Sequence, residues 1–183
     1  MSESSRTPVL LIVDMINPLD FPGGASMRPL AIEAAKRLAR LKKRFRDSGH
    51  PVVYVNDNFM DWQADFKEIV AVVGHDTPGA PLAELLAPEH DDYFVLKPKH
   101  SGFYETPLPT LLEKLQAGRL VVAGVATDGC VLATATDAHI REFDVHVPRD
   151  CVAAISTERT ERALALMKAS MHIDVRTSRY VDP

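Results

Sequence analysis

Residues 119–140 read RLVVAGVATDGCVLATATDAHI. The segment opens with an apolar run at 120–123, which has the length of a buried strand. Gly124 breaks this run, and the Thr-Asp-Gly sequence at 127–129 is typical of a helix start, because Thr and Asp are good N-cap residues. An Ala- and Thr-rich helix is predicted to follow. The segment therefore predicts a strand, a turn and a helix, with Cys130 where the helix begins.

A cysteine in that position has two interpretations. The helix dipole and the unpaired backbone N–H groups of a helix start favour the thiolate, which is the reactive form. The alternative is a small buried thiol that fills space, which is the more common situation for a cysteine in general. We favour a reactive Cys130, because its position and the flanking turn residues agree with the rest of the chain. Cys151 has no such context, and we expect it to be structural.

Length and composition limit the class of protein. The 183 residues, 46% of them hydrophobic, predict a single domain over 1–183 that begins with a polar tail at 1–7. The net charge of −4 gives no reason to expect nucleic acid or an anionic membrane as a partner, and no apolar run is long enough to cross a bilayer. Two cysteines make no disulfide framework, and the N-terminus lacks a signal-peptide core, so we expect a cytoplasmic protein.

The remaining apolar runs predict the other strands. They lie at 8–13, 51–55, 93–96 and 144–147, with a weaker candidate at 174–177. Helical segments separate most of them, and the first of these is predicted at 31–47. This alternation predicts an α/β fold with a mostly parallel sheet between two layers of helices.

Three chemically distinct side chains follow three of these strands. Asp14, Lys97 and Cys130 stand at strand ends, and the carboxyl edge of a parallel sheet is where such folds bind ligands. A turn or capping role is the alternative for Asp14. A thiolate attacks carbonyl carbon, a carboxylate moves the thiol proton to a leaving nitrogen, and an ammonium group stabilises both anions. Backbone N–H groups at the helix start would hold the oxyanion. The set predicts hydrolysis of an amide-like C–N bond through a thioester.

Aromatic residues on the loops after the first three strands are candidates for the substrate pocket. We expect Phe21, Trp62 and Phe103 to wall a small apolar cavity over Cys130, although Trp62 is equally suited to covering the core. The polar residues expected to orient a substrate there are Asn17, Asp20 and Asn58.

Three motifs together resemble the isochorismatase-like cysteine hydrolase family, which includes nicotinamidases and N-carbamoylsarcosine amidase. LLIVDM at 10–15 resembles the first strand of the family, VLKPKHSGFYETPL at 95–108 its lysine loop, and VVAGVATDGCVLATATDA at 121–138 its nucleophile segment. The resemblance covers nearly the whole chain, from Val9 to about Arg176. It places Asp14, Lys97 rather than Lys99, and Cys130 on the family's catalytic positions.

The resemblance implies further features of structure and assembly. It implies a three-layer α/β/α fold of Rossmann-like topology with a six-stranded parallel sheet in the order 3-2-1-4-5-6. It also implies a cis peptide between Val125 and Ala126 that aims N–H groups at the oxyanion, and a homodimer or larger homo-oligomer.

The sequence departs from the nicotinamidase pattern after the second strand. Nicotinamidases carry an Asp-x-His metal motif there, whereas this chain has Asp57, Asn58 and Phe59 and no histidine before His75. We therefore expect no metal and no other cofactor, and we expect a small-molecule substrate other than nicotinamide. His100 belongs to the lysine loop, where a hydrogen-bonding role is the simplest interpretation.

Three functions remain open from the sequence. The first, which we favour, is a metal-independent cysteine hydrolase of a small amide or ureido substrate. The second is a vinyl-ether hydrolase of the isochorismate type, which would not need Cys130. The third is a non-catalytic binding or redox protein. No Cys-x-x-Cys pair is present for thiol exchange, and no Gly-x-Gly-x-x-Gly follows the first strand for dinucleotide binding.

Overall fold

A computed structural model describes residues 7–63 and 65–183 of the chain. The polar tail expected at 1–7 lies outside the described residues except for Thr7, which begins the first strand.

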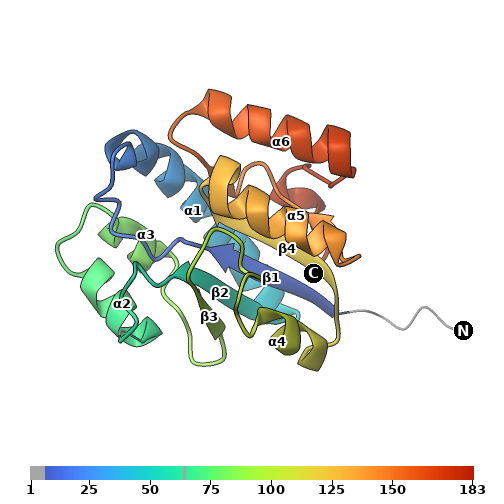
Figure 1. The fold of residues 1–183 in the computed structure, drawn as a ribbon, viewed down its shortest axis with the longest axis horizontal. Coiled ribbons are helices and arrows are strands. Elements are labelled where there is room, and N and C mark those ends of the chain that lie inside the picture. The colour runs from blue at the N-terminus through green and yellow to red at the C-terminus, as the bar shows by residue number, and fades with distance from the viewer. Residues whose placement is uncertain (1–6, 64) are drawn as a thin grey trace, which may run out of the picture.

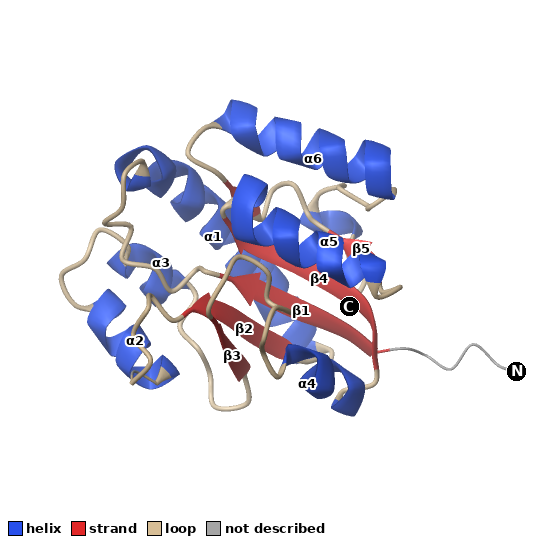
Figure 2. Cartoon of the chain, in the orientation of Figure 1, coloured by secondary structure: helices blue, strands red, loops and turns tan. Residues whose placement is uncertain are grey.

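All strand pairs of the sheet are parallel, and six strands take part. The central order is β3-β2-β1-β4-β5, and β6 pairs with β4. The predicted fold class, a six-stranded parallel sheet flanked by helices, is confirmed (Figure 2). The strands are β1 (Thr7–Val13), β2 (Val52–Asp57), β3 (Tyr93–Lys97), β4 (Ala117–Val125), β5 (Asp144–His146) and β6 (Val152–Ala153).

The sixth strand differs from the prediction in its residues and its neighbour. The run at 174–177 forms only one bridge, between Asp174 and His146. β5 pairs with the first part of β4 and ends at His146. The last residues of β4 are therefore open to β6, which pairs with Gly124 and Val125 instead of extending the sheet beyond β5.

The helices form two layers, one on each face of the sheet (Figure 1). One layer holds α1 (Gly24–Asp47), α2 (Phe66–Gly74) and α3 (Ala80–Leu85). The other holds α4 (Leu108–Lys114), α5 (Leu132–Ile140) and α6 (Thr157–Met171). Across residues 7–63 and 65–183, no helix has both the length and the apolar character needed to cross a membrane.

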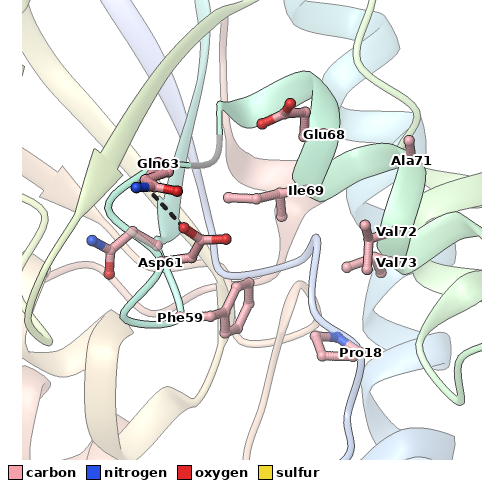
Figure 3. A pocket seen from close by; sticks show the side chains of 10 residues that line it. Pro18, Phe59, Asp61, Gln63, Glu68, Ile69, Ala71, Val72 and Val73 are labelled. Atoms are coloured by element: carbon pink, nitrogen blue, oxygen red, sulfur yellow. Dashed lines mark hydrogen bonds between the residues drawn. The ribbon is translucent and has the colours of Figure 1, made fainter.

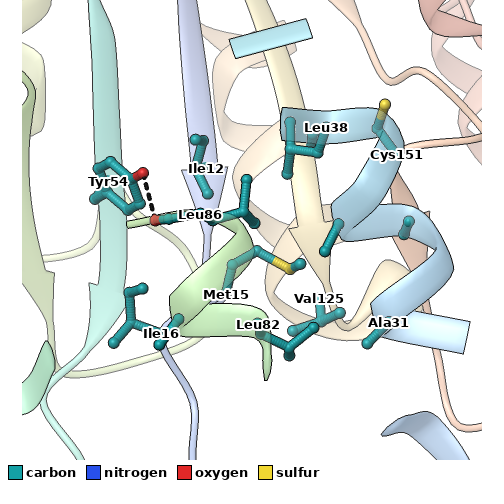
Figure 4. Packing of buried hydrophobic residues seen from close by; sticks show 14 of the residues in the cluster. Ile12, Met15, Ile16, Ala31, Leu38, Tyr54, Leu82, Leu86, Val125 and Cys151 are labelled. Atoms are coloured by element: carbon teal, nitrogen blue, oxygen red, sulfur yellow. Dashed lines mark hydrogen bonds between the residues drawn. The ribbon is translucent and has the colours of Figure 1, made fainter. Parts of the chain in front are cut away.

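Strand β1 is buried on both faces, which explains its uninterrupted apolar sequence. Leu10 and Ile12 pack toward α1, while Val9, Leu11 and Val13 pack toward the opposite layer. Figure 4 shows the α1 side, where the Tyr54 hydroxyl donates to the Leu86 carbonyl at 2.7 Å. Cys151 lies in this cluster and is fully buried, as expected for a structural thiol.

Helix α1 begins at Gly24, seven residues before the predicted start at 31, and contains Pro29. Proline disfavours a helix interior because it lacks an N–H donor. The extra turn nevertheless buries Met27 against the core, and the Met27 N–H donates to the Gly23 carbonyl at 3.0 Å. Burial of this side chain explains why the sequence pattern placed the helix start too late.

The β1–β4 pair sets the position of the candidate active site. Val13 pairs with Gly124 in the sheet, so Asp14 and Val125 emerge side by side at the carboxyl edge. Gly124 has φ 122°, and a Cβ atom there would lie 2.1 Å from the Val13 carbonyl oxygen. Only glycine permits this backbone contact, which brings the ends of the two strands together.

Candidate active site

The side chains of Asp14, Lys97 and Cys130 meet at the carboxyl edge of β1, β3 and β4. Lys97 Nζ lies 3.0 Å from Asp14 Oδ2 and donates to Cys130 Sγ at 3.3 Å. The Lys97 side chain is fully buried, and that of Asp14 is 6% exposed. The predicted convergence within ion-pair distance is therefore present.

Further contacts hold the lysine and the aspartate in place. Lys97 Nζ also donates to the Lys99 carbonyl at 3.0 Å and lies 3.5 Å from Asp57 Oδ2. The Asp57 backbone N–H donates to Asp14 Oδ1 at 2.7 Å. Both oxygens of the Asp14 carboxylate thus have partners, as a buried charge requires. The lysine loop is anchored to α5, since the Gly102 N–H donates to Thr134 Oγ1 at 3.0 Å.

Cys130 lies in a single turn of π-helix, η1 (Thr127–Val131), which leads into α5. Gly129 interrupts the helical geometry with φ −126° and ψ −106°, and the Val125–Ala126 peptide bond is cis. The prediction that Thr127 or Asp128 caps the helix is wrong. Ala126 takes the N-cap position without a side-chain hydrogen bond, because the Asp128 carboxylate forms an ion pair with Arg159 Nε instead.

The ionisation of the three groups follows from burial and from their mutual contacts. Burial and the Asp14 carboxylate raise the pKa of the Cys130 thiol to about 12, although Lys97 opposes this shift. Burial also raises the pKa of Asp14. For Lys97, burial disfavours the ammonium form, but Asp14 and Cys130 outweigh it and raise the pKa.

The 3.0 Å contact between Lys97 Nζ and Asp14 Oδ2 and the high pKa of Cys130 describe a thiol beside an ion pair. Lys97 favours the thiolate as expected, but burial and the Asp14 charge outweigh it, so the pKa of Cys130 is raised.

A cavity of about 520 Å³ opens above Cys130 at the ends of the strands. Its floor includes Asp14, Val125, Ala126 and Cys130. Asn17 and Phe21 line it as predicted. Its other lining residues are Pro22, Met27, Asp57, Phe59, His100, Asp128, Gly129, Ile155 and Arg159.

Four predicted pocket residues lie elsewhere. Trp62 is 72% exposed at the surface, and Phe103 is buried in the core beneath α5. Asp20 is exposed and does not line the cavity. Asn58 lines a neighbouring, more apolar cavity of about 670 Å³ beside α2, which shares only Phe59 with the first (Figure 3). Loop residues that follow a strand thus do not all turn toward its end.

Five residues of the cavity that could contact a substrate through an aromatic ring or a polar group were not predicted for it. Phe59 supplies the aromatic wall that was predicted for Trp62. Its backbone is left-handed, with φ 51°. Asp57, His100, Asp128 and Arg159 complete the set. Asp128 and His100 neighbour the predicted catalytic residues in sequence, which is the one signal that pointed to them. Arg159 belongs to the first turn of α6, and no motif marked it.

The position of the nicotinamidase metal motif does not fit a metal ion. The Asp57 carboxylate contacts Lys97 Nζ and accepts a hydrogen bond from the Phe59 N–H at 2.7 Å, and Phe59 offers no ligand atom. In the part of the chain that the structure describes, no three His, Cys, Asp or Glu side chains are grouped so as to hold a metal. Independence of a metal remains a prediction.

Comparison with known proteins gives the family. The sequence model of the isochorismatase domain matches residues 8–179. The chain is 37% identical to the uncharacterized isochorismatase family protein YaaI of Bacillus subtilis, covering 97% of this chain and 98% of that one. It is 32% identical to maleamate amidohydrolase of Pseudomonas putida, covering 80% and 72%.

A solved structure agrees with this result. The N-carbamoylsarcosine amidase of Thermoplasma acidophilum superposes with a TM-score of 0.74 at 28% identity, covering 97% of this chain and 99% of that chain. The chain therefore belongs to the isochorismatase family.

Proposed function

We propose that this protein is a metal-independent cysteine hydrolase that cleaves a C–N bond of a small amide or ureido substrate through a thioester. The observation that carries the proposal is the position of the Lys97 ammonium group, 3.0 Å from Asp14 and 3.3 Å from Cys130, two residues that line the cavity. The names of two similar proteins, maleamate amidohydrolase and N-carbamoylsarcosine amidase, support the same type of reaction.

The first step forms the thioester. As Cys130 Sγ bonds to the carbonyl carbon, its proton passes to Asp14, which contacts the thiol. The carbonyl electron pair moves to the oxygen, and we assign its stabilisation to the backbone N–H groups of Ala126 and Cys130, which both line the cavity. The high pKa of the resting thiol fits this coupling, because the thiolate then forms only as the proton moves to a neighbouring base.

The second step releases the amine and then the acid. The protonated Asp14 gives its proton to the leaving nitrogen as the C–N bond breaks, and ammonia or an amine departs. The Asp14 carboxylate next takes a proton from water, whose oxygen attacks the thioester carbon. The C–S bond breaks, and the proton returns from Asp14 to sulfur. Lys97 remains an ammonium group throughout and balances the negative charge on Asp14.

The test compares cysteine variants on a panel of amides and ureides, with ammonia release as the measurement. Cys130→Ala should lose at least about 10³-fold in turnover, because no other group in the cavity replaces the nucleophile. Cys151→Ala is the matched control, since this thiol is buried in the α1 cluster away from the cavity, and it should retain turnover. Full ammonia release by Cys130→Ala would contradict the proposal. If Cys130→Ala instead hydrolysed isochorismate at the wild-type rate, the vinyl-ether function would replace it.

A further inference from the structure

The catalytic cavity contains more carboxylates than cations. Asp14, Asp57 and Asp128 line it, and only Lys97 and Arg159 oppose them. Transfer of a proton from Cys130 to Asp14 leaves this balance unchanged, so the excess of negative charge persists through the first step. Like charges in a confined cavity repel an anionic ligand because the surrounding protein screens them poorly.

Both cations are already engaged by carboxylates. Lys97 is fully buried and contacts Asp14 at 3.0 Å and Asp57 at 3.5 Å. Arg159 lies on the rim, and its Nε forms an ion pair with Asp128. A substrate carboxylate would therefore have to compete with Asp128 for Arg159. The oxyanion that forms during attack replaces the negative charge that Asp14 loses on protonation, so the negative charge stays in the same space.

The other walls combine apolar side chains with Asn17, His100 and Asp57. The Asp57 side chain is 34% exposed at the cavity, where it repels a carboxylate and attracts a cation. The apolar lining residues are Phe21, Pro22, Met27, Phe59 and Ile155.

We infer that the cavity selects against substrates that carry a carboxylate beside the scissile bond and accepts neutral or positively charged amides. This inference rests on the proposed function only for the nature of the scissile bond. The inferred substrate preference differs from the one that the name of a similar protein, maleamate amidohydrolase, indicates, because maleamate is an anionic half-amide.

Two alkylating reagents of nearly the same shape test the inference without a known substrate. Iodoacetamide is neutral and iodoacetate is anionic, and both react with the same thiolate, so the high pKa of Cys130 cancels in the ratio of their rates. The ratio is measured at Cys130 by peptide mass spectrometry at pH 8, where histidine side chains are generally neutral. The reference is the same ratio of rates for 2-mercaptoethanol, because its thiol is free in solution and no protein charges lie near it.

The preference for iodoacetamide at Cys130 should exceed that of 2-mercaptoethanol by about tenfold and should fall as salt is added. Asp128→Asn removes one carboxylate and releases Arg159, so it should reduce the preference by about fivefold or more. Arg159→Gln should increase it. Asp144→Asn is the matched control, because it breaks an exposed Arg–Asp pair with Arg119 at the opposite end of β4, and it should leave the ratio unchanged.

A ratio at Cys130 equal to or below that of 2-mercaptoethanol would overturn the inference. So would a ratio that neither Asp128→Asn nor Arg159→Gln shifts. Either result leaves ammonia release intact and so leaves the proposed function standing. Failure of the proposed function instead shows as ammonia release by Cys130→Ala, which does not bear on the alkylation ratio.

Discussion

Lys97 is the residue on which the charges of the site depend. Its ammonium group is fully buried, and it neutralises Asp14, which is almost as deeply buried. The sequence identified Asp14, Lys97 and Cys130 correctly as a converging set, because each follows a strand whose apolar run is plain. The protonation of Cys130 was not predictable, since the burial that contributes most to its raised pKa cannot be judged from the sequence.

Replacement of Lys97 by Met should affect stability and turnover together. Loss of the cation should lower the free energy of unfolding by about 3–5 kcal/mol in urea denaturation, because the buried Asp14 must then either stay charged without a cation or bind a proton. Turnover should fall by about 10²–10⁴-fold, because Asp14 would then bind a proton and stop acting as a base.

Two further variants show how the Lys97→Met result should be interpreted. Lys99→Met is the control, since only the backbone carbonyl of Lys99 contacts the site and its side chain is exposed. It should leave both quantities unchanged. Adding Asp14→Asn to Lys97→Met should restore part of the stability and none of the turnover. An active Lys97→Met enzyme would show that the ion pair is only structural.

At the scale of elements, long apolar runs and strong helical patterns were predicted, and short pieces were not. β1 and β4 are the clearest strands because both faces are buried. β6 has only two residues, so no periodicity marks it. The prediction of Trp62 and Phe103 as pocket walls was wrong for a related reason. The turns after β2 and β3 decide where these side chains point, and a sequence pattern does not show the direction of a side chain on a loop.

The close approach of β1 and β4 predicts the effect of a methyl group at Gly124. Gly124→Ala should lower the free energy of unfolding by about 2–5 kcal/mol, because the Cβ would meet the Val13 carbonyl oxygen and φ is positive. Gly74→Ala, at the end of α2, is the control, since no atom lies within 4 Å of its Cβ position. Denaturant unfolding checks both. Equal stability of the two variants would mean that β1 and β4 can move apart at this point without a loss of stability.

At the scale of the whole molecule, the half-buried thiol of Cys130 and the buried thiol of Cys151 make stability sensitive to alkaline pH. Burial raises the pKa of Cys130 to about 12 and also raises that of Cys151. An unfolded thiol ionises near pH 8.5, so the unfolded chain loses protons that the folded chain keeps. This contribution to stability is therefore complete below about pH 8.5 and is lost as the pH rises toward the folded values.

The free energy of unfolding should fall by about 1.4 kcal/mol per pH unit for each thiol between about pH 9 and 10. Cys151→Ala should remove about half of the slope that the two thiols cause. Urea denaturation at a series of pH values measures it. A slope that is the same in Cys151→Ala and wild type would contradict the assigned burial of this thiol.

The central claim is that an acyl group is carried on Cys130, and hydroxylamine tests it most directly. A primary amide and its N-methyl amide share one acyl group, so both should give the same thioester and the same ratio of hydroxamate to acid at a given hydroxylamine concentration. Cys130→Ala should give neither product. Hydroxamate that is absent during ammonia release, or a ratio that changes with the leaving amine, would contradict the thioester.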